Sequence, residues 1–185
     1  MKPLHTQKFR QARSIRVRPH MTSGFARASF FDASALVKLY VDEPQSDVVR
    51  GYFNTEATKF TSTFCFYETL NILKSKWKHS AKLTRDEYLE ACFRLTAWHA
   101  FNERYITNPE LTEPKTLHAA RDLAKSTNLD MSDALQLISV KEGYFSALSS
   151  GSQTVFVTAD KDLAVQARNL GLRVWEVMSE APPPP

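Results

Sequence analysis

Hydrophobic and polar positions along the chain form short segments that predict strands and helices in turn. Residues 28–32 (ASFFD) are an aromatic run that predicts a buried strand ending in an acid. Residues 35–40 carry apolar side chains at helical spacing, and Pro44 ends that pattern. Residues 154–158 (TVFVT) are β-branched or aromatic almost throughout, which predicts the clearest strand of the chain.

The other segments continue the same alternation. Residues 47–53 predict a short helix, and residues 59–63 predict a strand edge followed by a helix that Ser62 or Thr63 can cap. The remaining expected elements are a helix from Phe66 to Trp77, a helical stretch over 84–125 with a break near Asn108 and Pro109, a helix capped by Ser132, a turn at Gly151 and Ser152, a helix over 163–170 stopped by Gly171, and a strand over 173–177. Such alternation predicts an α/β fold with a parallel sheet covered on both faces.

Composition fits a single globular domain over residues 28–178, with 43% hydrophobic and 24% charged residues in the whole chain. The last seven residues, 179–185, predict a Pro-rich tail that continues neither helix nor strand. Residues 1–27 predict a basic arm, because the first 20 residues hold six basic side chains and no acidic one. That arm is either disordered, or the result of a start placed upstream of a true start at Met21, or a targeting peptide.

The net charge of +4 says little about the predicted domain itself. Removing the six basic residues of the arm from the total of 24 leaves 18 Lys and Arg against 20 Asp and Glu. A positively charged arm can attract phosphates without sequence preference, but the domain is slightly acidic. The charge therefore does not by itself predict a nucleic-acid-binding surface on the domain.

No segment approaches the roughly 18 consecutive apolar residues of a membrane span, so we expect no membrane association. The start of the chain also lacks the apolar stretch of a secretory signal. Cys65 and Cys92 are far apart and fit no zinc or redox motif, which indicates two reduced thiols in a cytoplasmic protein.

Four acidic residues occupy positions from which their side chains could converge. Asp32 ends the first predicted strand, and Asp160 lies two residues past the strand at 154–158, so both project from the same edge of a parallel sheet. Glu68 and Asp133 lie near the starts of helices whose neighbouring positions are largely apolar. An acid on such a face is costly to bury unless it is paired or bound to a metal.

Each acid also has an ordinary structural explanation. Asp32 could cap a helix, Asp133 could complement a helix dipole, and Glu68 could face solvent. Together they indicate a site, because converging carboxylates repel one another and bind divalent cations. Oxygen ligands without His or Cys favour Mg²⁺ or Mn²⁺, and such ions promote phosphoryl transfer.

Four motifs around these acids resemble those of PIN-domain nucleases, in particular the VapC toxins of toxin–antitoxin pairs. They are Asp32-Ala-Ser-Ala-Leu-Val-Lys-Leu-Tyr40, Thr61-Ser-Thr-Phe-Cys-Phe-Tyr-Glu68, Met131-Ser-Asp133-Ala-Leu-Gln-Leu and Val157-Thr-Ala-Asp160-Lys-Asp162-Leu. All four occur in the order of that family, and the resemblance spans about residues 28–178.

The resemblance implies a Rossmann-like α/β/α sandwich and an endoribonuclease that depends on Mg²⁺ or Mn²⁺. It implies a cognate antitoxin and a homodimer as partners, and RNA as the substrate. The residues that it assigns are Asp32, Glu68, Asp133 and Asp160 as the catalytic, metal-binding quartet, Asp162 as a secondary metal-binding acid, and Ser34 and Thr158 as hydroxyls that orient the carboxylates. The long basic arm and the Pro tail depart from the usual pattern of these toxins.

Other functions stay open at this point. A housekeeping RNA-processing nuclease would use the same residues, and only its substrate and the absence of an antitoxin would separate it from a toxin. A non-catalytic interaction module would not need the intact quartet, and an aspartyl-phosphate enzyme would want a second acid where Ser34 stands. A basic run could also bind along an RNA backbone; the run comprises Lys74, Lys76, Trp77, Lys78, His79 and Lys82. The preferred interpretation is a solvated helix face with Trp77 packed inward.

Overall fold

Five parallel strands form one sheet in the order β3-β2-β1-β4-β5 in the computed structural model of the chain. The structure describes residues 28–56, 58–102, 106–107, 113–142 and 154–184. The expected basic arm, the break near residues 108–109 and the turn at 151–152 lie outside these described residues.

Each predicted segment of strand or helix within the described residues corresponds to an element of the structure. The elements are β1 (Ala28–Phe31), α1 (Ala33–Tyr40), α2 (Ser46–Thr55), β2 (Thr58–Ser62), α3 (Thr63–Lys78), α4 (Arg85–Phe101), β3 (Ile106–Thr107), α5 (Pro114–Ser126), α6 (Met131–Glu142), β4 (Val155–Thr158), α8 (Lys161–Asn169) and β5 (Arg173–Glu176).

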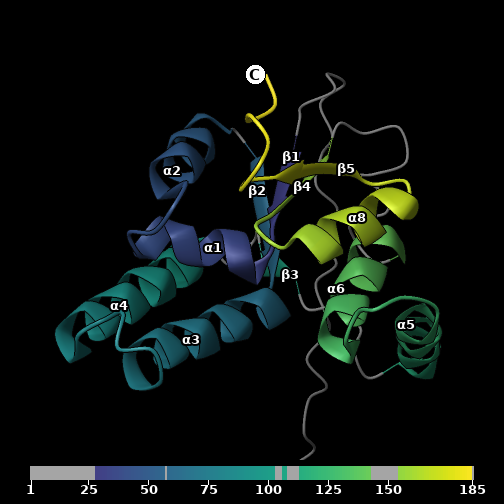
Figure 1. Cartoon of the computed structure of the whole chain (residues 1–185), viewed down its shortest axis with the longest axis horizontal. Helices are drawn as coiled ribbons and strands as arrows, with labels where there is room; N and C mark the ends of the chain where they lie inside the picture. Colours follow the sequence, from purple (N-terminus) through teal and green to yellow (C-terminus); the bar gives the residue numbers. More distant parts are fainter. Residues whose placement is uncertain (1–27, 57, 103–105, 108–112, 143–153, 185) are drawn as a thin grey trace, which may run out of the picture.

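Helices cover both faces of the sheet, with α1 to α4 on one side and α5, α6 and α8 on the other (Figure 1). This arrangement confirms the predicted α/β/α sandwich with a central parallel sheet. The strands themselves are buried on both faces: every residue of β1 and of β4 is buried. Continuous apolar strands are what a parallel sheet between two helical layers requires.

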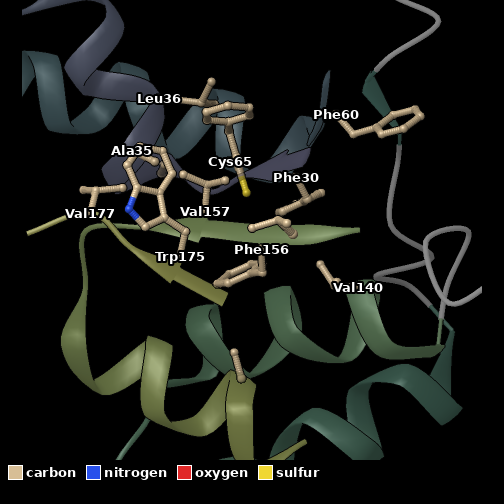
Figure 2. Close-up of a cluster of buried hydrophobic side chains, with 14 of the residues drawn as sticks. Phe30, Ala35, Leu36, Phe60, Cys65, Val140, Phe156, Val157, Trp175 and Val177 are labelled. Atoms are coloured by element: carbon tan, nitrogen blue, oxygen red, sulfur yellow. The ribbon is translucent and has the colours of Figure 1, made fainter. Parts of the chain in front are cut away.

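Aromatic residues fill the core between the layers. Phe30 and Phe156 stack on neighbouring strands with their ring centroids 5.7 Å apart. Figure 2 shows Leu36 and Cys65 on one side of the sheet and Val140 on the other. Trp175 of β5 is fully buried as well, and burial of each such large side chain contributes roughly 2–3 kcal/mol to folding.

Two details of the structure differ from the sequence predictions. β3 pairs with β2 through only two residues, and a strand that short leaves no alternation to detect within a helical stretch. The expected cap Ser132 is wrong, because α6 begins at Met131, two residues before a helix capped by Ser132 would begin, and Asp130 Oδ1 accepts the hydrogen bond from Asp133 N at 2.9 Å. Ser62, by contrast, caps α3 as expected, with its hydroxyl accepting from Cys65 N.

The helices, the two cysteines and the C-terminal segment can each be compared with the sequence predictions. None of the described helices is both long and apolar enough to cross a membrane. Cys65 is buried, Cys92 is partly buried, and both are free thiols. Glu180, within the expected tail, pairs with Arg168 at 2.6 Å, and its backbone oxygen accepts from Trp175 Nε1 at 3.1 Å.

Candidate active site

Asp32 stands at the junction of β1 and α1, where a buried strand turns directly into a helix. Its side chain is only 2% exposed, and its Oδ1 accepts a hydrogen bond from Ala35 N at 2.7 Å, which caps α1. Ser34 Oγ lies 2.9 Å from Oδ1 and 3.0 Å from Oδ2, and Thr158 Oγ1 donates to Oδ2 at 2.6 Å. Asp32 therefore does cap α1. Its carboxylate also accepts hydrogen bonds from two hydroxyls, one on α1 and one on β4.

These two hydroxyls connect the carboxyl ends of β1 and β4. Ser34 Oγ accepts from Ala159 N at 2.7 Å, and Thr158 Oγ1 accepts from Asp160 N at 3.0 Å. The loop that carries Asp160 is therefore held to Asp32 by hydrogen bonds through each hydroxyl. Ser34 and Thr158 thus fix where the two strand-end acids lie relative to each other.

Asp160 caps α8 in the same way as Asp32 caps α1. Its Oδ1 accepts from Leu163 N at 2.9 Å, and the residue is exposed at the end of the sheet. Asp162 is also exposed, in the first turn of α8. Within the described residues, Asp162 is not among the carboxylates that raise the pKa of the other acids.

Glu68 and Asp133 approach from the two helical layers. Glu68 lies in the second turn of α3 and Asp133 in the first turn of α6, and both are half-buried. Among the described residues, Glu68 Oε2 is buried without any hydrogen-bond partner. A buried acceptor that is left unpaired is unfavourable by roughly 1–3 kcal/mol, and a cation or a donor bound there would relieve this cost.

The pKa values show that the acids form one electrostatic group. Burial raises the pKa of Asp32 to about 7, hydrogen bonds from Thr158, Ala35 and Ser34 lower it in part, and the charge of Asp160 adds to the increase. Burial, followed by the charges of Asp32, Asp133 and Asp130, raises the pKa of Glu68 to about 7.

The same causes act on Asp133. Burial, followed by the charges of Asp130 and Asp160, raises the pKa of Asp133 to about 6. Each of the four expected acids therefore interacts with at least one other, although they come from four separate elements. Like charges in a poorly solvated place raise each other's pKa in this way.

Asp130 is the acid that the sequence analysis missed. It is the residue that caps α6, and its charge contributes to the raised pKa of both Glu68 and Asp133. The sequence held one signal for it: Asp is a preferred N-cap residue, and Asp130 lies three positions before Asp133. Ser132 is of an equally suitable type, so the sequence could not decide between the two.

The fit of these residues to a divalent cation can be tested on the donor set. Among the described residues, no three His, Cys, Asp or Glu side chains are gathered closely enough to form a finished metal-binding group. Nevertheless, the unpaired Glu68 oxygen and the mutual repulsion of the acids are both relieved by a positive charge. All the donors are carboxylate oxygens, which suits Mg²⁺ or Mn²⁺. The residues present therefore fit such an ion.

Comparison with known proteins identifies a family and solved structures of similar fold. A family model described as PIN domain matches residues 29–169. The structure of FitAcB from Neisseria gonorrhoeae superimposes with a TM-score of 0.58 at 12% identity, covering 82% of this chain and 99% of that chain. The structure of PAE2754 from Pyrobaculum aerophilum gives a TM-score of 0.52 at 21% identity, covering 80% of this chain and 84% of that chain. No curated protein matches the chain significantly.

Proposed function

The chain belongs to the PIN-domain family, and from this premise we propose that it is an endoribonuclease that depends on Mg²⁺ or Mn²⁺. PIN domains are generally nucleases. The observation that carries the proposal is the buried, unpaired oxygen of Glu68 within a group of acids that raise each other's pKa. Asp32, Glu68, Asp133 and Asp160 would hold the ion.

A bound cation would polarise the phosphodiester and make the attacking water more acidic. Asp32 is suited to a fixed ligand, because α1, Ser34 and Thr158 all restrain its carboxylate. The single hydroxyl proton of Ser34 is shared between two oxygens, which leaves Asp32 a free lone pair.

Glu68 would bind the ion from α3 and help to orient the attacking water. Its Oε2 has no hydrogen-bond partner among the described residues, so this oxygen is free to bind the ion. Asp133 and Asp160 would complete the ligand set from α6 and from the end of β4. In-line attack on phosphorus would leave 5′-phosphate and 3′-hydroxyl ends, as the resemblance to the family implies.

We also propose a biological role for this ribonuclease. The four motifs resemble those of VapC toxins, which supports a toxin controlled by a cognate antitoxin and active as a homodimer. Asp162, one position past Lys161, is proposed as an additional acid near the ion, and Ser34 and Thr158 as the hydroxyls that orient Asp32.

A cleavage assay tests the enzymatic proposal. Purified protein with Mn²⁺ is expected to cut a mixed single-stranded RNA, to stop on addition of EDTA, and to resume when Mn²⁺ or Mg²⁺ is added in excess. DNA of the same sequence serves as the matched substrate control and is expected to be cut more slowly. RNA cleavage that continues undiminished in EDTA would exclude this proposal, as would the absence of cleavage under every metal condition.

A further inference from the structure

Tyr67 is an aromatic side chain that the structure leaves open beside the acidic group. It immediately precedes Glu68 on α3 and is 61% exposed. Its ring meets the ring of the buried Phe66 nearly edge-on, at 5.3 Å between centroids and an interplanar angle of 76°. The contact with Phe66 helps to hold the ring, and most of Tyr67 stays exposed next to Glu68.

The exposed face of α3 continues from Tyr67 with polar and basic side chains. Asn71, Lys74 and Lys78 follow at four, seven and eleven residues, which places all of them on one side of the helix. All three are exposed. At 1.5 Å per residue, Lys74 lies about 10 Å and Lys78 about 17 Å from Tyr67 along the helix axis. We call Tyr67, Asn71, Lys74 and Lys78 the α3 face.

Two other members of the basic run that includes these lysines, Lys76 and Trp77, are engaged elsewhere. Lys76 Nζ pairs with Glu43 at 2.6 Å, and Trp77 packs inward on Tyr88 with ring centroids 4.8 Å apart. Lys74 and Lys78 form no ion pair among the described residues, although Lys78 Nζ lies 3.9 Å from the centre of the Trp77 ring. The inward packing of Trp77 is as expected, but two lysines of the run share a face with an exposed aromatic.

We propose that the α3 face binds the unpaired RNA strand that flanks the cleaved phosphodiester. Tyr67 stacks on a base next to the cleaved bond, and Lys74 and Lys78 bind phosphates further along the strand. This inference rests on the proposed ribonuclease function and adds its substrate class. A base within a duplex is stacked between its neighbours, so only an unpaired base can present its face to Tyr67.

The composition of the α3 face favours RNA over a protein partner. The centre of a protein interface is depleted in charge, whereas here one aromatic is followed by an amide and two lysines. A line of one aromatic and two cations fits a polyanion with exposed bases.

Binding measured without cleavage separates this inference from the enzymatic one. In the Asp32→Asn background with Mg²⁺, the anisotropy of a short fluorescein-labelled single-stranded RNA reports affinity. Tyr67→Ala is expected to weaken binding at least about fivefold, and Tyr67→Phe to bind like the parent, because stacking needs the ring and not the hydroxyl. Phe93→Ala is the matched control, since Phe93 is 68% exposed on α4, and it should leave affinity unchanged.

Replacing the lysines is expected to change the salt dependence of RNA binding in the same assay. Lys74→Ala combined with Lys78→Ala should reduce the slope of log affinity against log salt by about 1.4, or about 0.7 for each lost phosphate contact. Tyr67→Ala should leave that slope unchanged. Lys115→Ala with Lys141→Ala is the control, because Lys115 lies in the first turn of α5 and Lys141 in the last turn of α6, two helices on the other side of the sheet from α3 (Figure 1).

The outcomes are distinct. The inference is overturned if Tyr67→Ala binds RNA like the parent, if the lysine pair leaves the salt slope unchanged, or if duplex RNA binds as tightly as the single strand. It is also overturned if Tyr67→Ala changes only the oligomeric state by size-exclusion chromatography, which would make the α3 face a protein interface. Binding with the expected dependence on Tyr67 and the lysines, but no cleavage by the wild type, would refute the enzymatic proposal and leave the α3 face supported.

Discussion

Replacing Asp32 by Asn is expected to slow RNA cleavage roughly a thousandfold or more while the fold stays intact. Two elements restrain its carboxylate: α1 through Ala35 N and the Ser34 hydroxyl, and β4 through Thr158. An amide in its place cannot supply the negative charge that the proposed cation requires.

The same substitution should not weaken the protein. The amide oxygen of Asn can keep the cap on Ala35 N, and its NH₂ can donate to the hydroxyl oxygens of Ser34 and Thr158 once these rotate. Burial raises the pKa of Asp32 to about 7, so the ionised carboxylate is unfavourable there without a cation. The Tm of Asp32→Asn should therefore equal that of the wild type at neutral pH or exceed it by a few degrees.

Cleavage rates and thermal unfolding of the two proteins check this pair of expectations. Asp122→Asn is a suitable control, because Asp122 is exposed on α5 and pairs only with the adjacent Arg121 among the described residues. If Asp32→Asn cut RNA at the wild-type rate, Asp32 would have no catalytic part. If it unfolded instead, the role of Asp32 would be structural.

Replacing Glu43 by Gln is expected to destabilise the fold by roughly 3 kcal/mol, which lowers Tm by about 6–12 °C. Glu43 accepts from Lys38 at 2.9 Å and from Lys76 at 2.6 Å. Lys38 lies on α1, the helix that Asp32 caps, and its side chain is only 5% exposed. A neutral glutamine could still accept from one lysine through its amide oxygen, but it would leave the buried ammonium of Lys38 without a counter-charge, beside the carbonyl oxygen of Pro44 at 2.9 Å.

The pH dependence of this contribution has a definite sign. Burial alone would raise the pKa of Glu43, but hydrogen bonds from Lys76 and Lys38 outweigh it and lower the pKa. A lowered pKa gives stability that is present above the ordinary carboxyl range and is lost as the pH falls. Glu43→Gln should therefore remove part of the acid sensitivity of the wild type.

Urea unfolding at neutral and at acidic pH measures both effects. The control is Asp42→Asn, because the Asp42 side chain is 92% exposed in its pair with Arg50, and such surface pairs contribute at most about 1 kcal/mol. Equal stability of Glu43→Gln and the wild type at neutral pH would contradict a buried ion network between α1 and α3.

The strand-end acids were predictable from the sequence for a physical reason. A parallel sheet brings the carboxyl ends of its strands to one edge, so an acid after residues 28–31 and another after residues 155–158 must lie close. Glu68 and Asp133 were predictable only through the motifs, because periodicity alone does not show that α3 and α6 start beside the same strand ends.

Other details could not be predicted from the sequence. The apolar run around Phe66 and Tyr67 does not show which ring faces outward, since neighbouring helical positions differ by only 100°. The start of α6 was ambiguous because both Asp130 and Ser132 suit an N-cap. In each case a shift of one or two residues along the helix decides which side chain meets the site.

The raised pKa values connect the acids to a measurable property of the metal-free protein. Asp32, Glu68 and Asp133 hold their protons to higher pH in the folded chain than in the unfolded chain. Their contribution to stability is therefore present at low pH and is lost as the pH rises through the raised values, from about 6 to about 7. A cation that binds these carboxylates must displace those protons.

Calorimetric titration of Mn²⁺ into the metal-free protein tests most directly that these acids act as one metal-binding centre. At about pH 6.5, Mn²⁺ should bind saturably and release protons. The proton release makes the measured heat of binding depend on the ionisation enthalpy of the buffer. Near about pH 8.5 the release should become small, because the three acids are already ionised. The Asp32→Asn protein should bind far more weakly. No saturable binding, or binding that is the same with and without the Asp32 carboxylate, would contradict the centre.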